Sequence, residues 1–216
     1  MFLKSLDFST THKNPTLMEN CNNTGLYDSL KFCQGTTVLP GIRNHIYGLP
    51  KRDIVAWPKR PQPGADAATM ASIASYSGNF TLAADRKWLR IDLVLNKGQI
   101  EAEVQGEQPS RTFLNKLSAV HPSVEEEATA FAQQVTQDDF VFLVPQRNGK
   151  YRVLGNEMFN TDVKPKLALG EGTTGEAGTT LEIEVTDLSP APFYPGIIET
   201  EDGDISGADG SLSAAE

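Results

Sequence analysis

The stretch FVFLVPQRNGKYRVLGN, residues 140–156, constrains the fold of this chain most strongly. Its first five residues are all apolar, which is typical of a strand that is covered on both faces of a sheet. Asn148-Gly149 is the strongest short signal for a tight hairpin turn, because both residue types accept positive φ. Residues 151–155 then alternate between the two faces of a second strand. We therefore predict a β-hairpin whose first strand lies in the centre of a sheet.

Two further pairs of strands are predicted from alternating apolar residues. In KWLRIDLVLNKGQIEAEVQGE, the turn Asn96-Lys97-Gly98 separates two alternating runs and predicts a hairpin with one buried face. Residues 162–169 and 179–188 form the other pair and flank the loop GEGTTGEAG. The residues expected to face the core are Leu89, Ile91, Leu93, Leu95, Ile100, Ala102, Val104, Leu181, Ile183 and Val185. Two short strand-like runs, 42–49 and 53–57, precede a proline-rich loop that extends to about residue 70.

One helix is predicted, in PSVEEEATAFAQQV. Ser123 and Glu126 have the spacing of a capping box, and acidic residues suit the N-terminal end of the helix dipole. The residues that share its apolar face are Val124, Ala128, Phe131, Ala132 and Val135. A shorter amphipathic piece, TFLNKL, precedes it, with two apolar residues at the i, i+4 spacing of a helix. Six to nine strands and one principal helix predict an α+β fold, a mainly antiparallel β-barrel or sandwich with one flanking helix.

Composition and charge indicate the character of the two terminal segments and limit the class of partner. The 216 residues, 39% of them hydrophobic, suffice for one large β domain or two small ones. Residues 1–40 show no sustained period and predict an extended arm. The segment 198–216 holds six acidic residues and no basic one, so we expect an acidic flexible tail. Without it the net charge of -9 becomes -3, which disfavours a protein that grips nucleic acid, because phosphate binding needs clustered Lys and Arg.

The cysteines and the N-terminal stretch bear on the compartment. Cys21 and Cys33 are the only cysteines, so a disulfide framework is not expected, although one bridge between them stays open. The start, MFLKSLDFSTTHKN, lacks the apolar region of a secretion signal, and nowhere do 18 apolar residues run together. We expect a chain that is made and kept in a reducing cytoplasm and has no membrane anchor.

No motif in the sequence predicts catalytic, cofactor-binding or metal-binding residues. Residues 170–175 match G-x-G-x-x-G, but a strand rather than a helix is expected to follow, so we interpret them as a hairpin loop. The histidines, His12, His45 and His121, have no second ligand at a metal-site spacing. Cys21, Cys33 and His45 are too widely spaced for a zinc site. The signatures of serine hydrolases, P-loop proteins and zinc proteases do not occur.

Three aromatic residues leave two interpretations open. Trp57, Tyr76 and Trp88 could form a sugar-stacking platform, which would make the chain a β-sandwich carbohydrate-binding module. Trp88, however, begins an alternating strand, where packing in the core or at a subunit interface is the commoner role of a large aromatic side chain.

Seven sequence segments, in this order along the chain, resemble those of a known group of proteins. They are GNF, KWLRIDLVLNKGQIEAEVQGE, FLNKL, EEEATAFA, FVFLVPQRNGKYRVLGN, GTTLEIEV and PAPFYPG. This series, within residues 40 to 197, resembles small virion proteins of tailed bacteriophages, including crAss-like phages. The resemblance implies a tail-tube-like β domain over residues 41–197, with the arm and the acidic tail outside it. It also implies copies that close into rings around the DNA channel, and it supplies no catalytic residues.

These observations lead to a first expected function, with a β-sandwich carbohydrate-binding module on the virion surface as the alternative. We expect a non-enzymatic virion structural protein that forms a homo-oligomeric ring of the tail tube or head-tail connector. Its partners would be copies of itself, neighbouring tail or portal-complex rings, and phage DNA that passes the lumen without specific binding. It would be made in the host bacterial cytoplasm and end in the tail or neck of the virion. The residues expected at the subunit interface are Arg147, Asn148, Gly149, Lys150, Trp88, Phe193 and Tyr194.

Overall fold

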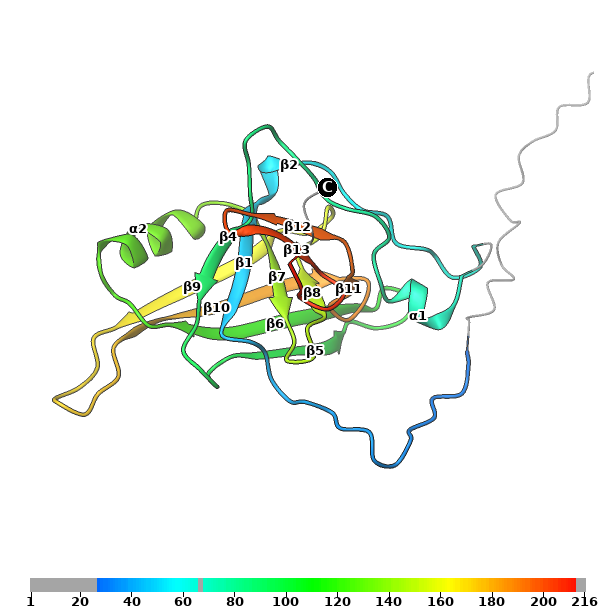
Figure 1. Cartoon of the computed structure of the whole chain (residues 1–216), viewed down its shortest axis with the longest axis horizontal. Helices are drawn as coiled ribbons and strands as arrows, with labels where there is room; N and C mark the ends of the chain where they lie inside the picture. Colours follow the sequence, from blue (N-terminus) through cyan, green and yellow to red (C-terminus); the bar gives the residue numbers. More distant parts are fainter. Residues whose placement is uncertain (1–26, 66–67, 213–216) are drawn as a thin grey trace, which may run out of the picture.

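The protein is mostly antiparallel β-sheet with few helices (Figure 1). A computed structural model describes residues 27–65 and 68–212. The larger sheet has five strands, in the spatial order β11 (Phe193–Tyr194), β8 (Tyr151–Leu154), β7 (Phe140–Pro145), β1 (His45–Pro50) and β4 (Leu89–Asp92). All its neighbouring strands run antiparallel. The apolar strand β7 is therefore central, as predicted from its unbroken run of apolar residues.

A second sheet packs against the first. Its four strands, in spatial order, are β5 (Gln99–Gln105), β6 (Thr112–His121), β10 (Gly178–Asp187) and β9 (Thr161–Ala168). Smaller elements complete the fold: the 3-10 helix η1 (Lys51–Asp53), the pair β2 (Ile54–Ala56) and β3 (Thr81–Leu82), the helices α1 (Met70–Ile73) and α2 (Glu126–Val135), and the hairpin of β12 (Ile197–Thr200) and β13 (Gly203–Ser206). No ladder joins the two large sheets among the described strands, so they form no closed barrel.

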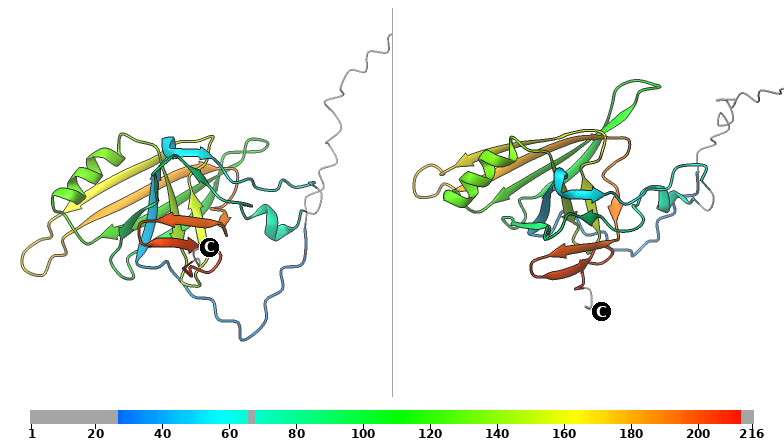
Figure 2. Two further views of the ribbon diagram at one scale, coloured as in Figure 1. Left: turned by 45° about the horizontal axis from the view of Figure 1, so that its top comes forward. Right: turned by 90° about the horizontal axis from the view of Figure 1, so that it is seen from above.

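The central strands of the five-stranded sheet are buried on both faces, because two apolar clusters enclose them. Phe142 and Val144 of β7 point into a cluster that also holds Leu117 and Ile183 of the other sheet. Val141 and Leu143 point the opposite way, into a second cluster. The β12–β13 hairpin, red in Figure 2, helps to cover this second cluster on the side away from the four-stranded sheet. The result is three layers, with β7 in the middle one.

Two of the predicted hairpins are confirmed. Strands β7 and β8 pair antiparallel around the Asn148-Gly149 turn, and Gly149 has a φ of 93°. Strands β9 and β10 pair antiparallel on either side of the 170–175 loop, which no helix follows. In β10 the residues predicted to face the core, Leu181, Ile183 and Val185, are buried.

The predicted helix is confirmed in position, but its expected cap is wrong. Helix α2 buries Ala128, Ala132 and Val135, and Phe131 packs partly against the core. The helix begins at Glu126, after the N-cap Glu125, which makes no side-chain capping bond. Ser123 lies two residues before the N-cap, and its Oγ instead accepts a hydrogen bond from the Glu125 amide at 3.2 Å.

The predicted hairpin over residues 88–104 is wrong. Strand β4 pairs with β1 in the larger sheet, whereas β5 pairs with β6 in the smaller one. The turn is as expected, since Asn96 has a φ of 64°, but it carries the chain from one sheet to the other. Leu89 and Leu95 are exposed rather than buried. Alternation defines the two faces of a strand but does not specify which neighbour the strand pairs with.

The short piece TFLNKL is a strand rather than an amphipathic helix. It begins β6, in which Phe113, Asn115 and Leu117 share the face toward the core. An i, i+4 spacing fits a strand as well as a helix, because every second residue of a strand points the same way. The apolar spacing alone therefore could not distinguish the two.

The acidic segment from residue 198 packs against the body, contrary to the expectation of a flexible tail. Ile198 is fully buried, and the Trp88 amide donates to the Glu199 carbonyl at 2.9 Å. Ile198 and Thr200 face in while Glu199 and Glu201 face solvent, so the acidic residues do not have to be desolvated. The outer part of the predicted arm, residues 1–26, and residues 213–216 lie outside the described part of the chain.

A glycine substitution tests whether the C-terminal segment packs on the β7–β8 turn. A Cβ at Gly149 would lie 2.0 Å from the Asp209 carbonyl oxygen, whereas a Cβ at Gly78 would meet nothing within 4 Å. Both glycines have similar positive φ, 93° and 88°, so alanine at either costs roughly 1–2 kcal/mol of backbone strain. We expect Gly149→Ala to lower the free energy of unfolding in urea by clearly more than Gly78→Ala. Equal losses would mean that residues 207–210 do not rest on the turn.

Candidate functional site

The tip of the β7–β8 hairpin is a well-defined surface. The Gln146 amide donates to the Lys150 carbonyl at 2.8 Å, and the Gly149 amide donates to the Gln146 carbonyl at 3.0 Å. Arg147, Asn148 and Lys150 are exposed, and the Arg147 guanidinium contacts the Asn96 side chain. Gly149 is buried beneath the Asp209 carbonyl. Three of the four predicted tip residues therefore present side chains to solvent.

Beside this tip, Phe193 forms part of an apolar hollow. Arg152 lies over the Phe193 ring at 4.1 Å and Lys150 at 5.9 Å. Burial lowers the pKa of Arg152, whose guanidinium donates to the Ala191 carbonyl at 2.7 Å. The residues that line the hollow, which has a volume of 350 Å³, are Ala71, Ala74, Ser75, Lys150, Phe193, Tyr194, Pro195, Gly207 and Ala208. Lys150 and Phe193, which lie 43 positions apart in sequence, thus share one surface.

Two of the residues predicted at the interface are not on the surface. Trp88 is 1% exposed and Tyr194 is fully buried. The Tyr194 hydroxyl accepts from the Phe80 amide at 3.1 Å and donates to the Ile197 carbonyl at 2.8 Å, and burial raises its pKa to about 12. Both side chains hold the second core together, because large aromatics that alternate with polar residues also suit an interior face. Their placement at an interface is therefore corrected.

The three residues of the possible sugar platform do come together around the buried Phe80, but Trp88 is buried and Trp57 and Tyr76 are half-buried. Trp57, Tyr76 and Trp88 surround Phe80, with ring centroids 5.3, 6.2 and 5.4 Å from its centroid. Burial raises the pKa of Tyr76 to about 12. A sugar ring stacks only on an exposed aromatic face, and Trp88 has none. Of the roles considered for Trp88, core packing is the one that the structure shows.

The described part of the arm, residues 27–40, is the most unusual surface of the protein. It forms no strand or helix, and every residue in it is exposed (Figure 2, blue). Its large apolar side chains with their exposed fractions are Tyr27 93%, Leu30 90%, Phe32 69%, Val38 72% and Leu39 51%. Apolar side chains gathered in this way on one segment mark a surface that contacts something else. The sequence showed these residues as scattered, but only the structure shows that the body leaves them uncovered.

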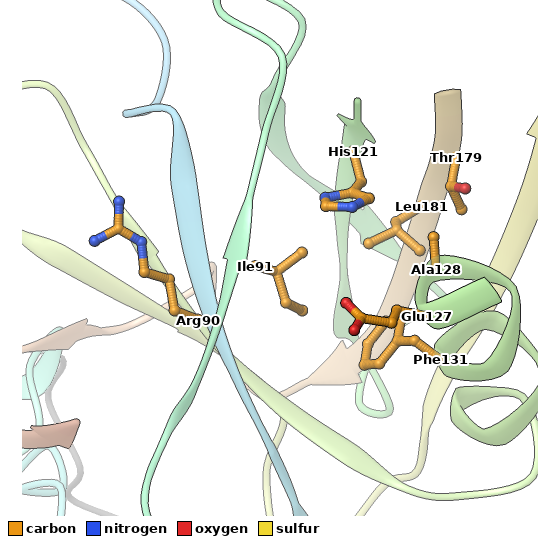
Figure 3. Close-up of a pocket in the computed structure, with 8 residues that line it drawn as sticks. All are labelled: Arg90, Ile91, His121, Glu127, Ala128, Phe131, Thr179 and Leu181. Carbon is orange, nitrogen blue, oxygen red and sulfur yellow. The ribbon is translucent and has the colours of Figure 1, made fainter. Parts of the chain in front are cut away.

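A cavity of 190 Å³ lies between α2 and the two sheets and was not predicted (Figure 3). Ile91, Phe131 and Leu181 give it an apolar interior, and Glu127 and His121 approach it from α2 and from the end of β6. The His121 Nδ1–H donates to the Asp92 carbonyl at 2.7 Å, which holds the ring in place and leaves Nε2 as the remaining ring nitrogen. Such a cavity can hold a small apolar group. Its residues come from four separate elements, so no local motif could reveal it.

The remaining candidates from the sequence form no site in the described part of the chain. No group of three His, Cys, Asp or Glu residues there is placed to hold a metal ion. Cys33 is exposed, whereas His12 and Cys21 lie outside the described residues. Among the helices that the structure describes, none has the length and apolar character needed to cross a membrane.

Comparison of the chain with protein-family models, curated proteins and solved structures finds no match.

Histidine 45, on β1, makes the stability of the sandwich sensitive to pH. Burial, then the positive charges of Arg90 and Arg43, lower its pKa below the ordinary value of 6.5. Its Nδ1 is buried without a hydrogen-bond partner. Because the unfolded chain takes up the proton at higher pH than the folded one, stability falls as pH drops below the unfolded pKa.

We expect the free energy of unfolding to decrease between about pH 7.5 and about pH 5.5, where histidine titrates. The variant His45→Phe should flatten this slope, since it removes the titrating group. Asn44→Ala, at the exposed neighbouring position, serves as the control and should keep the slope of the original protein. Urea unfolding at a series of pH values measures all three. An unchanged slope in His45→Phe would contradict the assignment.

Proposed function

We propose that this chain is a virion structural protein of a tailed bacteriophage, which assembles with copies of itself into a ring of the tail tube or head-tail connector. The resemblance of residues 40–197 to such proteins supports the class. The observation that supports assembly is the exposure of the large apolar side chains of the arm, which the body of the chain does not cover. Each such side chain gains roughly 1.5–3 kcal/mol when it is buried, so a neighbouring copy that covers the arm stabilises the assembly.

The sandwich suits the role of a rigid subunit. Both faces of the central strand β7 are dry, continuous ladders join β7 to β1 and β6 to β10 within the two sheets, and a shared apolar cluster packs one sheet against the other. Each large sheet also ends in edge strands, which are the usual places where another chain can pair. A ring closes when such a contact repeats by rotation between identical copies.

The outer face of the four-stranded sheet is compatible with a channel that DNA passes. The charged residues on it are Glu101, Glu103, Asp162, Glu182, Glu184, Lys116, Lys164 and Lys166. Lys164 is held by Glu184 at 2.8 Å and by Asp162 at 3.0 Å, and Lys116 is held by Glu103. The acidic residues outnumber the lysines, and the paired lysines are not free to grip phosphate. Such a face lets DNA move past without adhering.

The hairpin tip supplies the test of this function. We expect negative-stain electron microscopy of the concentrated protein to show annular particles with a central hole. The double variant Arg147→Glu, Lys150→Glu should fold but lose the rings or their stacking, because it reverses the charge that the tip offers to a neighbour. Both side chains are exposed, so thermal unfolding should shift little.

The matched control is Lys59→Glu, Lys87→Glu, which changes the net charge equally at two other exposed positions. It should still form rings. If the tip variant assembles as well as the control, the tip is not an assembly surface. If the unaltered protein gives only small uniform particles at every concentration, self-assembly into a ring is not supported.

A further inference from the structure

We propose that residues 29–33 of one copy pair as an added strand with the free edge of β5 in a second copy. This inference rests on the proposed function, since it names the contact through which neighbouring copies would be joined. It brings together two features that have no evident purpose within a single chain: an exposed apolar arm and an edge strand whose inner face is exposed at Ala102 and Val104.

Strand β5 is open to a partner along its whole length. Among the described strands it pairs only with β6, so every second residue directs its backbone N–H and C=O groups away from the sheet. No hydrogen bond from another described backbone segment reaches residues 99–105 from that side. A strand of seven residues with a free edge is a template for pairing with another chain.

The two faces of β5 differ in chemistry. Ile100 and Ala102 lie opposite Leu117 and Asn115 of β6, and so face the interior side of the sandwich. Val104 is on the same face, opposite Phe113, yet it is 57% exposed. The opposite face of the strand carries Glu101 and Glu103. An added strand must therefore be apolar on one face and positively charged on the other.

A hollow beside the inner face gives room for large side chains. It has a volume of 290 Å³. The residues that line it are Ile100, Glu101, Ala102, Gln146, Arg152, Pro190 and Ala191. Four of these offer mainly aliphatic surface, so the hollow suits a leucine or phenylalanine carried by the neighbouring strand.

The arm has the complementary pattern. In Ser29-Leu30-Lys31-Phe32-Cys33, an extended backbone places Leu30 and Phe32 on one face and Lys31 on the other. Beside β5, the two apolar side chains would lie next to Ile100 and Ala102, which line the hollow, and Lys31 next to Glu101. Glu101 makes no ion pair with any described residue, whereas Glu103 already binds Lys116. Lys31 and Glu101 are therefore the expected charge pair.

The arm of a second copy fits better than the arm of the same chain. The root of the arm, Ile42, packs against Gly98, at the start of β5. Phe32 lies ten positions before Ile42, a distance of about 33 Å in an extended chain, whereas β5 spans only about 23 Å. An extended arm of the same chain would thus carry Phe32 past the end of β5. In the structure it turns instead toward α1, where the Asp28 amide meets the Met70 sulfur at 2.8 Å.

Disulfide trapping between separately prepared full-length proteins tests the pairing directly. All variants carry Cys21→Ser and Cys33→Ser to remove the native thiols. A protein with Ala102→Cys is mixed with a mass-tagged protein that carries Leu30→Cys or Phe32→Cys, and oxidised. Because the two thiols are on different molecules, only contact between copies can give the mixed dimer. The matched control is Lys31→Cys, whose thiol would face the opposite side of the added strand.

We expect the mixed dimer from Leu30→Cys or Phe32→Cys to exceed that from Lys31→Cys several-fold. Lys31→Glu, introduced beside Phe32→Cys, should lower the yield about 2- to 5-fold, the range of an exposed ion pair. Adding Glu101→Lys to the partner should restore it. Equal yields from the two faces, or no mixed dimer, would overturn the proposal.

Electron microscopy of the same samples separates this proposal from the proposed function. Rings without the cross-link would overturn the pairing of the arm with β5 and leave the ring intact. The cross-link without rings would support the pairing and count against the ring.

Discussion

The rest of the structure depends on strand β7 being dry on both faces. A strand of this kind can satisfy its backbone groups only through ladders on both edges, which β1 and β8 provide. Its side chains then require one apolar layer above the sheet and one below. The four-stranded sheet and α2 supply the first layer, and the Phe80–Trp88–Tyr194 cluster supplies the second. Most other features of the fold follow from these two requirements.

The second layer explains why the C-terminal segment is ordered despite its charge. It covers a cluster of aromatic rings that the sandwich alone would leave in water, and it does so with Ile198 and a backbone bond to Trp88. The free energy gained from burying apolar area outweighs the cost of ordering the acidic segment because its carboxylates stay in solvent. The same segment rests on the β7–β8 turn through Asp209. The hairpin tip and residues 207–210 therefore form one continuous surface, beside the hollow at Phe193.

The surfaces that remain uncovered are the ones we associate with assembly. The body buries its large aromatic residues, yet it leaves the arm exposed, and Ala102 and Val104 on the inner face of β5 are exposed as well. Arm and edge strand match in polarity and charge, and both lie away from the cavity beneath α2. If copies assemble as we propose, their contacts would therefore lie at the edges of the sheets and along the arm. The double-sided core provides the rigidity that such contacts need.

The sequence by itself determined the elements that depend on local pattern. The central apolar strand, its Asn148-Gly149 turn, the β9–β10 hairpin and the apolar face of α2 could all be predicted, because alternation, helical periodicity and turn chemistry act over a few residues. Of the candidate surface, it predicted the exposed tip residues Arg147, Asn148 and Lys150. A large aromatic residue suits the core of a subunit as well as an interface between subunits, and the sequence does not distinguish the two. Trp88 and Tyr194 are therefore predicted at an interface although they lie in the core.

Only the tertiary structure decided which strands pair and what covers them. The sequence of residues 88–104 predicts a hairpin, yet its two strands belong to different sheets. The pairing of a strand is decided by contacts with residues that are far from it in sequence. TFLNKL became a strand because its ladder with β10 could form. Residues 197–206 pack on an aromatic cluster that is assembled from distant segments. The cavity beneath α2 is likewise lined by residues of four separate elements. These outcomes depend on the burial of non-local surface, for which a local pattern carries no information.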